Sequence, residues 1–188
     1  MASNLYIGLV HHPVYDRRRE VVTTAVTNFD IHDISRCART FGLGGFFIIT
    51  PLESQVELVE RIIGHWRNGT GSVYNPTRKE SLSLVRVSRS IDEADQEISR
   101  LHQKKARRVA TGASSYPDCV GYGDLRRLLK DRETPFFLLF GTGWGLTQEV
   151  KGSSDYVLAP IEGKGYNHLS VRSAVAIILD RLIGEGIE

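Results

Sequence analysis

Short apolar runs alternate with helical segments along almost the whole chain, and this alternation constrains the fold more than any other feature. The predicted strands are residues 4–10, 45–50, 81–88, 107–114, 135–141 and 155–160. The predicted helices are residues 30–42, 53–66, 91–105, 124–131 and 169–183, and residues 67–80 are expected to be irregular. Strands that alternate with helices favour a mostly parallel sheet covered on both faces. We therefore expect an α/β fold.

The size and residue usage favour one domain over residues 1–188. The chain has 41% hydrophobic residues, enough for one substantial core. Cys37 and Cys119 provide neither a disulfide framework nor a metal-ligand spacing, so no bound metal is expected. No run approaches the roughly 18 apolar residues of a membrane span, and no basic leader precedes the first apolar run. A cytoplasmic protein is the expectation.

Three loops rich in Gly, Ser or Thr follow the last three predicted strands. They are ATGASSYP at 110–117, FGTGWG at 140–145 and APIEGKGYNHLS at 159–170. Open α/β sheets bind ligands at the carboxyl ends of their strands, and glycines let a ligand approach the backbone. Ordinary turn chemistry explains any one such loop, but three together favour a shared ligand site.

The familiar nucleotide motifs are absent from these loops. Gly141, Gly143 and Gly145 lack the spacing of G-x-G-x-x-G, and the sequence contains neither a G-x-x-x-x-G-K-[ST] phosphate loop nor a G-x-S-x-G elbow. Binding by backbone loops without a phosphate motif suits a purine nucleoside with a charged, unphosphorylated tail. S-adenosylmethionine (SAM) is such a molecule.

Two carboxyl-terminal stretches carry a family resemblance. FLLFGTGWGL at 137–146 and DYVLAPIEGKGYNHLSVRSAVAIILDRL at 155–182 resemble the second and third motifs of the SPOUT RNA methyltransferases. Residues 9–42 are similar to a small bacterial branch of that class. The resemblance implies a C-terminal deep trefoil knot, SAM as the methyl donor, and RNA, either tRNA or rRNA, as the substrate.

The resemblance also implies which residues hold the donor, since three loops of the knot surround it in that class. The implied donor-binding residues are Thr111, Gly112, Ala113, Gly141, Thr142, Gly143, Trp144, Gly145, Ile161, Gly163, Tyr166, Asn167, His168, Leu169 and Ser170.

The first motif of the ribose-methylating branch implies the catalytic residues. Arg36, six residues before Gly42, matches its catalytic arginine, but Asp30 stands where that branch has asparagine. The methylated atom therefore stays open. Candidate catalytic residues are Arg36, Asp30 and Asn28, with His12 and Asp33 as possible helpers; a helix cap at Asp30, with Asp33 in the first turn, is the structural alternative.

RNA contacts must come from clustered basic residues, because the net charge of +2 is small. Arg17, Arg18 and Arg19 are consecutive, and His32 and Arg39 lie near Arg36. These five are the expected RNA-binding residues. The last helix carries a broad apolar band that predicts a homodimer, although a buried core helix explains the same band.

Two other functions fit the same residues. A knotted domain could bind RNA or a protein as a catalytically idle assembly factor, and it would then transfer no methyl group. An α/β enzyme acting on a small nucleoside would show no salt-sensitive affinity for RNA.

Overall fold

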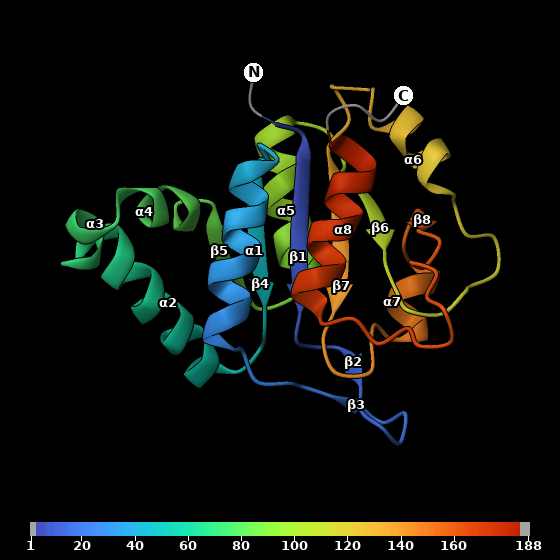
Figure 1. Cartoon of the computed structure of the whole chain (residues 1–188), viewed down its shortest axis with the longest axis horizontal. Helices are drawn as coiled ribbons and strands as arrows, with labels where there is room; N and C mark the ends of the chain where they lie inside the picture. The colour runs from blue at the N-terminus through green and yellow to red at the C-terminus, as the bar shows by residue number, and fades with distance from the viewer. Residues whose placement is uncertain (1–2, 185–188) are drawn as a thin grey trace.

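A six-stranded sheet forms the centre of the computed structural model, which describes residues 3–184 (Figure 1). The strands are β1 (Leu5–Val10), β4 (Gly45–Ile49), β5 (Val85–Ser88), β6 (Arg107–Ala110), β7 (Phe136–Gly141) and β8 (Tyr156–Val157), and a separate hairpin pairs β2 (Val14–Tyr15) with β3 (Val21–Val22). The helices are α1 (Asn28–Thr40), α2 (Glu53–Asn68), α3 (Gly71–Tyr74), α4 (Pro76–Leu82), α5 (Ile91–His102), α6 (Tyr122–Leu128), α7 (Gln148–Gly152) and α8 (Val171–Ile183).

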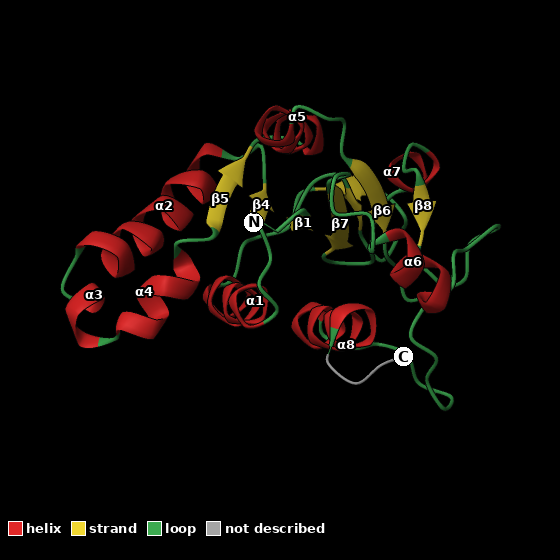
Figure 2. Cartoon of the chain, turned by 90° about the horizontal axis from the view of Figure 1, so that it is seen from above, coloured by secondary structure: helices red, strands yellow, loops and turns green. Residues whose placement is uncertain are grey.

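All strands of the sheet run parallel, in the order β5-β4-β1-β7-β6-β8. In Figure 2, α1 and α8 cover one face, and α5 and α7 lie on the other. Parallel strands need crossover connections, and right-handed βα units place those helices on the sheet faces. The expected α/β class, with a parallel sheet between helices, is confirmed.

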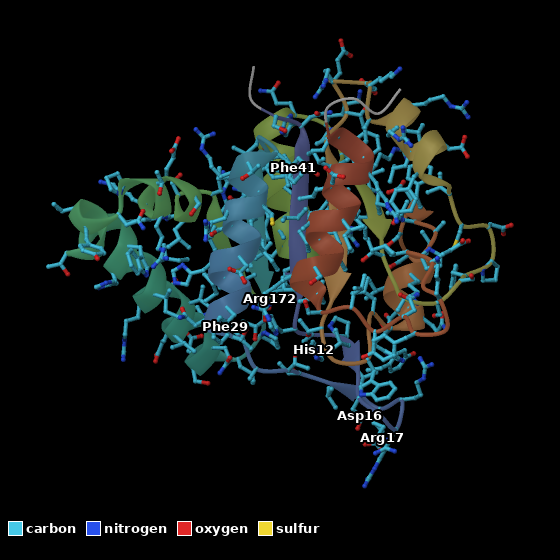
Figure 3. All side chains as sticks on the ribbon, viewed as in Figure 1. His12, Asp16, Arg17, Phe29, Phe41 and Arg172 are labelled. Carbon is cyan, nitrogen blue, oxygen red and sulfur yellow. The ribbon has the colours of Figure 1, made fainter. Side chains whose placement is uncertain are left out.

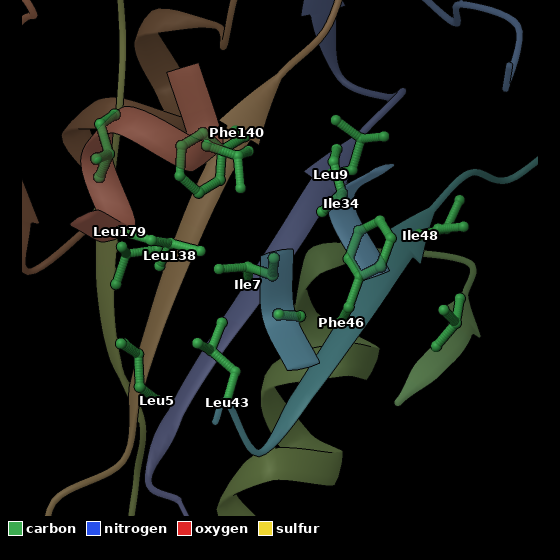
Figure 4. Packing of buried hydrophobic residues seen from close by; sticks show 14 of the residues in the cluster. Leu5, Ile7, Leu9, Ile34, Leu43, Phe46, Ile48, Leu138, Phe140 and Leu179 are labelled. Carbon is green, nitrogen blue, oxygen red and sulfur yellow. The ribbon is translucent and has the colours of Figure 1, made fainter. Parts of the chain in front are cut away.

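The sheet separates two apolar cores because successive side chains of a strand point to opposite faces. Leu5, Ile7 and Leu9 of β1 pack with α1 and α8 in the first core (Figure 4). Tyr6 and Val10 face α5 and α7 in the second. All six residues of β1 are buried, as expected for a strand covered on both faces.

The last helix, α8, buries much of its apolar side against the sheet of the same chain. Val175, Ile178 and Leu182 of α8 are buried against the sheet. Much of the apolar band that predicts a dimer is therefore covered within the chain itself.

Four segments differ from the sequence-based expectation. Residues 67–80, expected to be irregular, contain α3 and most of α4; the Asn75 side chain accepts the backbone N–H of Arg78 and Pro76 occupies the first turn. The expected strand at 81–88 begins only at Val85, because residues 81–82 complete α4. The β2–β3 hairpin and α7 were not predicted, since strands of two residues and a helix of five leave too short a pattern.

Strand β8 runs between two parts of an earlier segment. On one side it pairs with Val109 and Ala110 of β6. On the other side the Val120 N–H donates to the Val157 carbonyl at 2.8 Å, and the Ala159 N–H donates to the Val120 carbonyl at 2.9 Å. Residues 111–119 therefore pass around β8, and the chain that continues to α8 emerges between these two partners.

Candidate active site

A cavity of about 500 Å³ lies beyond the carboxyl ends of β6 and β8. Its lining residues come from two of the three glycine-bearing loops and are Ala113, Ser114, Ser115, Pro160, Ile161, Glu162, Gly163, Gly165, Tyr166 and Asn167. The volume lies within the roughly 300–1,000 Å³ of small-molecule sites. Five of the expected donor-binding residues therefore share one cavity: Ala113, Ile161, Gly163, Tyr166 and Asn167.

The two loops of this cavity hold each other in place. The Asn167 side-chain amide donates to the Ala113 carbonyl at 2.8 Å. A Cβ at Gly163 would lie 2.1 Å from the Tyr166 carbonyl oxygen, a distance that no side chain tolerates. The turn at 163–166 thus requires glycine, and it leaves backbone groups beside the cavity.

Other expected donor residues shape the loops without lining this cavity. Thr111 is buried and donates its hydroxyl to the Leu139 carbonyl at 2.9 Å. Ser170 caps α8 by accepting the Ser173 N–H, and the rings of His168 and Tyr166 meet edge to face at 5.3 Å. A Cβ at Gly112 would lie 3.3 Å from Nζ of Lys151.

The FGTGWG loop docks on the β2–β3 hairpin. The Trp144 N–H donates to the Tyr15 carbonyl at 2.8 Å, and the Tyr15 N–H donates to the Gly145 carbonyl at 2.9 Å. Gly143 has φ +58°, and a Cβ there would lie 2.9 Å from the Tyr15 carbonyl oxygen. Gly141 is the last residue of the neighbouring strand β7 and residues 142–145 follow it, while the indole of Trp144 stays exposed.

A buried histidine joins β1 to this loop. The Thr142 hydroxyl donates to the Val10 carbonyl at 2.9 Å and lies 2.5 Å from the Thr24 hydroxyl oxygen, which lies 2.9 Å from Nδ1 of His11. Each hydroxyl has one proton, so Thr24 donates to Thr142 and accepts from His11. Nδ1 of the neutral imidazole therefore carries the proton. Burial lowers the pKa of His11 to about 4.

Protonation of His11 should make stability pH-dependent. Its folded-state pKa of about 4 lies below the ordinary 6.5, so the unfolded chain binds the proton first as the pH falls. The free energy of unfolding should fall by about 2 kcal/mol between pH 7.5 and pH 5, at 1.36 kcal/mol per pH unit below 6.5. Urea unfolding at both pH values measures this loss, and His11→Asn should remove it. An equal loss in the variant would contradict the assignment.

The first turn of α1 is fastened to α8. Thr27, and not Asp30, is the cap: its hydroxyl oxygen accepts the Asp30 N–H and its hydroxyl donates to the Asp30 carboxylate at 2.6 Å. Arg172 lies 3.4 Å from the other Asp30 oxygen and donates to Asp33 at 3.0 Å. Both carboxylates are thus occupied within the chain. Figure 3 shows Arg172 beside the exposed Phe29.

Arg36 lies in a second cavity, of about 570 Å³, between α1, α2 and α4. Asn28 and His32 line the same cavity, so three of the expected RNA-contacting or catalytic residues of α1 come together there. Arg36 has no hydrogen bond or ion pair to another residue in the range 3–184. Arg39 lies outside this cavity and pairs with Glu80. No residue lines both cavities.

The three consecutive arginines occupy the tip of the hairpin. Figure 3 shows Asp16 and Arg17 at the end of this projection, with His12 nearer the sheet. The Asp16 carboxylate accepts the N–H groups of Arg18 and Glu20, which fixes the turn. Arg17, Arg18 and Arg19 are all exposed. The hairpin that carries them is the one that contacts the FGTGWG loop.

The chain has the fold of a solved methyltransferase structure. The SpoU methyltransferase AviRb from Streptomyces viridochromogenes, solved in complex with the cofactor AdoMet, matches with a TM-score of 0.57 at 20% identity, over 97% of this chain and 58% of that one. The shared architecture is thus that of SPOUT methyltransferases.

A family model described as SAM-dependent RNA methyltransferase matches residues 4–184. The chain belongs to this family.

Two curated relatives match nearly the whole chain. A tRNA (guanine-N(1)-)-methyltransferase of Oleidesulfovibrio alaskensis is 44% identical over 98% of this chain, which spans only 43% of that protein. An uncharacterized protein of Aquifex aeolicus is 39% identical over 96% of this chain and 88% of its own length. The chain therefore spans less than half of the relative with a named activity.

Within residues 3–184, no three His, Cys, Asp or Glu side chains gather where they could hold a metal ion. No helix of the described part is long and apolar enough to cross a bilayer.

Proposed function

We propose that this chain transfers a methyl group from SAM to RNA. The observation that carries the proposal is the cavity between residues 113–115 and 160–167, with a turn that only glycine allows at position 163. Backbone N–H and C=O groups of such loops suit the adenosine of the donor, and its position matches the ligand site expected for a parallel sheet. A relative of the same fold binds AdoMet.

The chemistry requires little from the protein beyond orientation. Bound SAM would supply an electrophilic methyl carbon to an RNA oxygen or nitrogen and would leave as the uncharged thioether S-adenosylhomocysteine, and the proton of the nucleophile would pass to water. Arg36 is suited to hold a phosphate or the developing charge, because its guanidinium has no hydrogen bond or ion pair to another side chain within residues 3–184. Asp30 and Asn28 are proposed to position the first turn of α1, since the Asp30 carboxylate is already bound by Thr27 and Arg172.

The remaining donor and RNA contacts are assigned by position. The expected donor residues outside the cavity, from Gly141 to Gly145 and from His168 to Ser170, close the site from the neighbouring loops. Arg17, Arg18 and Arg19 extend the RNA surface along the hairpin.

The passage of β8 between β6 and Val120 supports a deep trefoil knot. The named relative makes tRNA the first substrate to test, and the cytoplasm the place of action.

A homodimer would cover apolar side chains that remain exposed near the two cavities. Phe29 is 68% exposed at the start of α1, and Leu169 is 45% exposed just before α8. Light scattering at micromolar concentration should give a dimer, and Phe29→Asp should shift it to monomer because a charge would be buried. Leu101→Asp, on α5 at the opposite face, is the control. A monomeric parent chain would contradict this prediction.

The decisive experiment for the function is transfer of a radioactive methyl group. The chain is incubated with labelled SAM and with total tRNA or rRNA from cells that lack the gene, and labelled nucleosides are identified by mass analysis. We expect one labelled nucleoside species. SAM binding without label in any RNA would overturn the enzymatic proposal and favour an idle assembly factor.

A further inference from the structure

The second cavity, called the groove below, is lined by arginines that have no carboxylate partner in residues 3–184. Three arginines line it, Arg36 from α1, Arg61 from α2 and Arg78 from α4. None of them has an ion pair with a carboxylate in the described part of the chain. The one carboxylate of the lining, Asp33, already accepts from Arg172. Elsewhere arginines pair within the chain, as in Arg39–Glu80, Arg107–Asp155 and Arg108–Asp95.

The floor of this groove is aromatic. The imidazoles of His32 and His65 meet the Trp66 indole edge to face, at centroid distances of 5.6 and 5.1 Å. The Arg78 guanidinium lies 4.5 Å from the Trp66 ring centroid. Nδ1 of His32 is buried without a hydrogen-bond partner in residues 3–184. Flat rings and guanidinium planes bind unstacked nucleobases.

The groove has the size and the position for one unit of an RNA chain. Its volume of about 570 Å³ lies in the range of small-ligand sites. Asn28 and Phe29 line it at the first turn of α1, where Arg172 ties α1 to the helix that follows the donor loop. The Phe29 ring at this mouth is 68% exposed and lies 5.4 Å from the Arg172 guanidinium.

We propose that this groove binds an unpaired nucleotide of the substrate RNA, with the base against Trp66, His32 and Arg78 and the phosphate at Arg36 and Arg61. The proposal rests on the proposed function for the identity of the polymer. The site differs from the donor cavity in every lining residue. It selects single-stranded RNA, because a paired base cannot reach an aromatic floor between helices.

The test uses the fluorescence of Trp66. The chain has two tryptophans, so Trp144→Phe leaves Trp66 as the sole reporter. A single-stranded RNA of 12 nucleotides without self-complementarity should quench this fluorescence saturably, and the matching duplex should bind at least roughly tenfold more weakly. Absence of quenching, or equal binding of the duplex, would overturn the proposal.

A charge variant tests the phosphate contact without disturbing the fold. Arg61 is exposed and has no ion pair in the described range 3–184, so Arg61→Gln should lower single-strand affinity roughly tenfold at 0.1 M salt and reduce the slope of log K against log salt by about 0.7. Arg100→Gln removes the same charge from α5, on the opposite face, and should change neither quantity. Equal effects of the two variants would show that only general charge matters.

The outcomes separate this proposal from the function on which it rests. RNA that quenches Trp66 in a protein that transfers no methyl group would contradict the enzymatic proposal and support the groove. Normal methyl transfer with indistinguishable Arg61→Gln and Arg100→Gln variants would contradict the groove alone.

Discussion

Replacing Gly163 with alanine is expected to lower the affinity for SAM by roughly 10- to 100-fold. The added Cβ would lie 2.1 Å from the Tyr166 carbonyl oxygen, so the turn at 163–166 must open. Forcing a turn into a sparsely populated backbone conformation costs about 1–3 kcal/mol, and 1.4 kcal/mol is tenfold in affinity. Isothermal calorimetry with SAM measures the loss directly.

A matched variant distinguishes a local effect from general destabilisation. Gly64 lies inside α2, and a Cβ there would meet nothing within 4 Å. Gly64→Ala should leave SAM affinity unchanged and raise helix stability slightly, since alanine favours a helix over glycine. If Gly163→Ala binds SAM with the parent affinity and a parent unfolding midpoint, residues 160–167 do not hold the donor.

Replacing Arg36 with alanine is expected to reduce methyl transfer roughly 10²-fold or more while SAM affinity is retained. The exposed Arg36 guanidinium lines the groove between α1, α2 and α4. It does not line the donor cavity, so its loss should not weaken SAM binding. If Arg36 formed an ion pair with Asp30 or Asp33, it would have only a structural role at the surface. Arg172 contacts both of those carboxylates instead. Single-turnover transfer at saturating RNA isolates the chemical step from RNA binding.

Two further variants sharpen the assignment of Arg36. Arg36→Lys keeps the charge and loses the planar fork, so it should recover RNA affinity more than transfer rate. Arg100→Ala removes an exposed arginine from the opposite face and should leave the rate unchanged. A near-parent rate for Arg36→Ala at saturating RNA would mean that the residue contributes charge only.

The sequence predicts the parts of the molecule that depend on local pattern. The six runs of the sheet and the long helices have clear periods, and the glycine-bearing loops follow the strands β6, β7 and β8. The two-residue strands of the hairpin have no period to detect. The Asn75–Pro76 start of α4 is a local signal, yet it lies in a segment rich in glycine and asparagine.

The donor cavity could be predicted from local sequence, whereas the groove around Arg36 could not. Ala113, Ile161, Gly163, Tyr166 and Asn167 come from quoted loops, and Ser114, Ser115 and Gly165 lie in those loops as well. The groove could not be predicted, because Arg61, Trp66 and Arg78 meet Arg36 only through the packing of α2 and α4 on α1. Arg172 is a similar case: its two carboxylate partners lie about 140 residues away in the chain.

The contact at Val120 also determines how the sheet ends. An outermost strand usually presents unpaired N–H and C=O groups that can recruit a strand from another molecule. The main-chain groups of Val157 and Ala159 are instead bonded to Val120, so the end of the sheet beside the donor cavity offers no template for aggregation. The opposite edge, β5, is four residues long and carries Arg86, which pairs with Glu97. Both ends are protected by short or charged elements, and glycine-rich loops remain open at the ligand end without the risk of strand exchange.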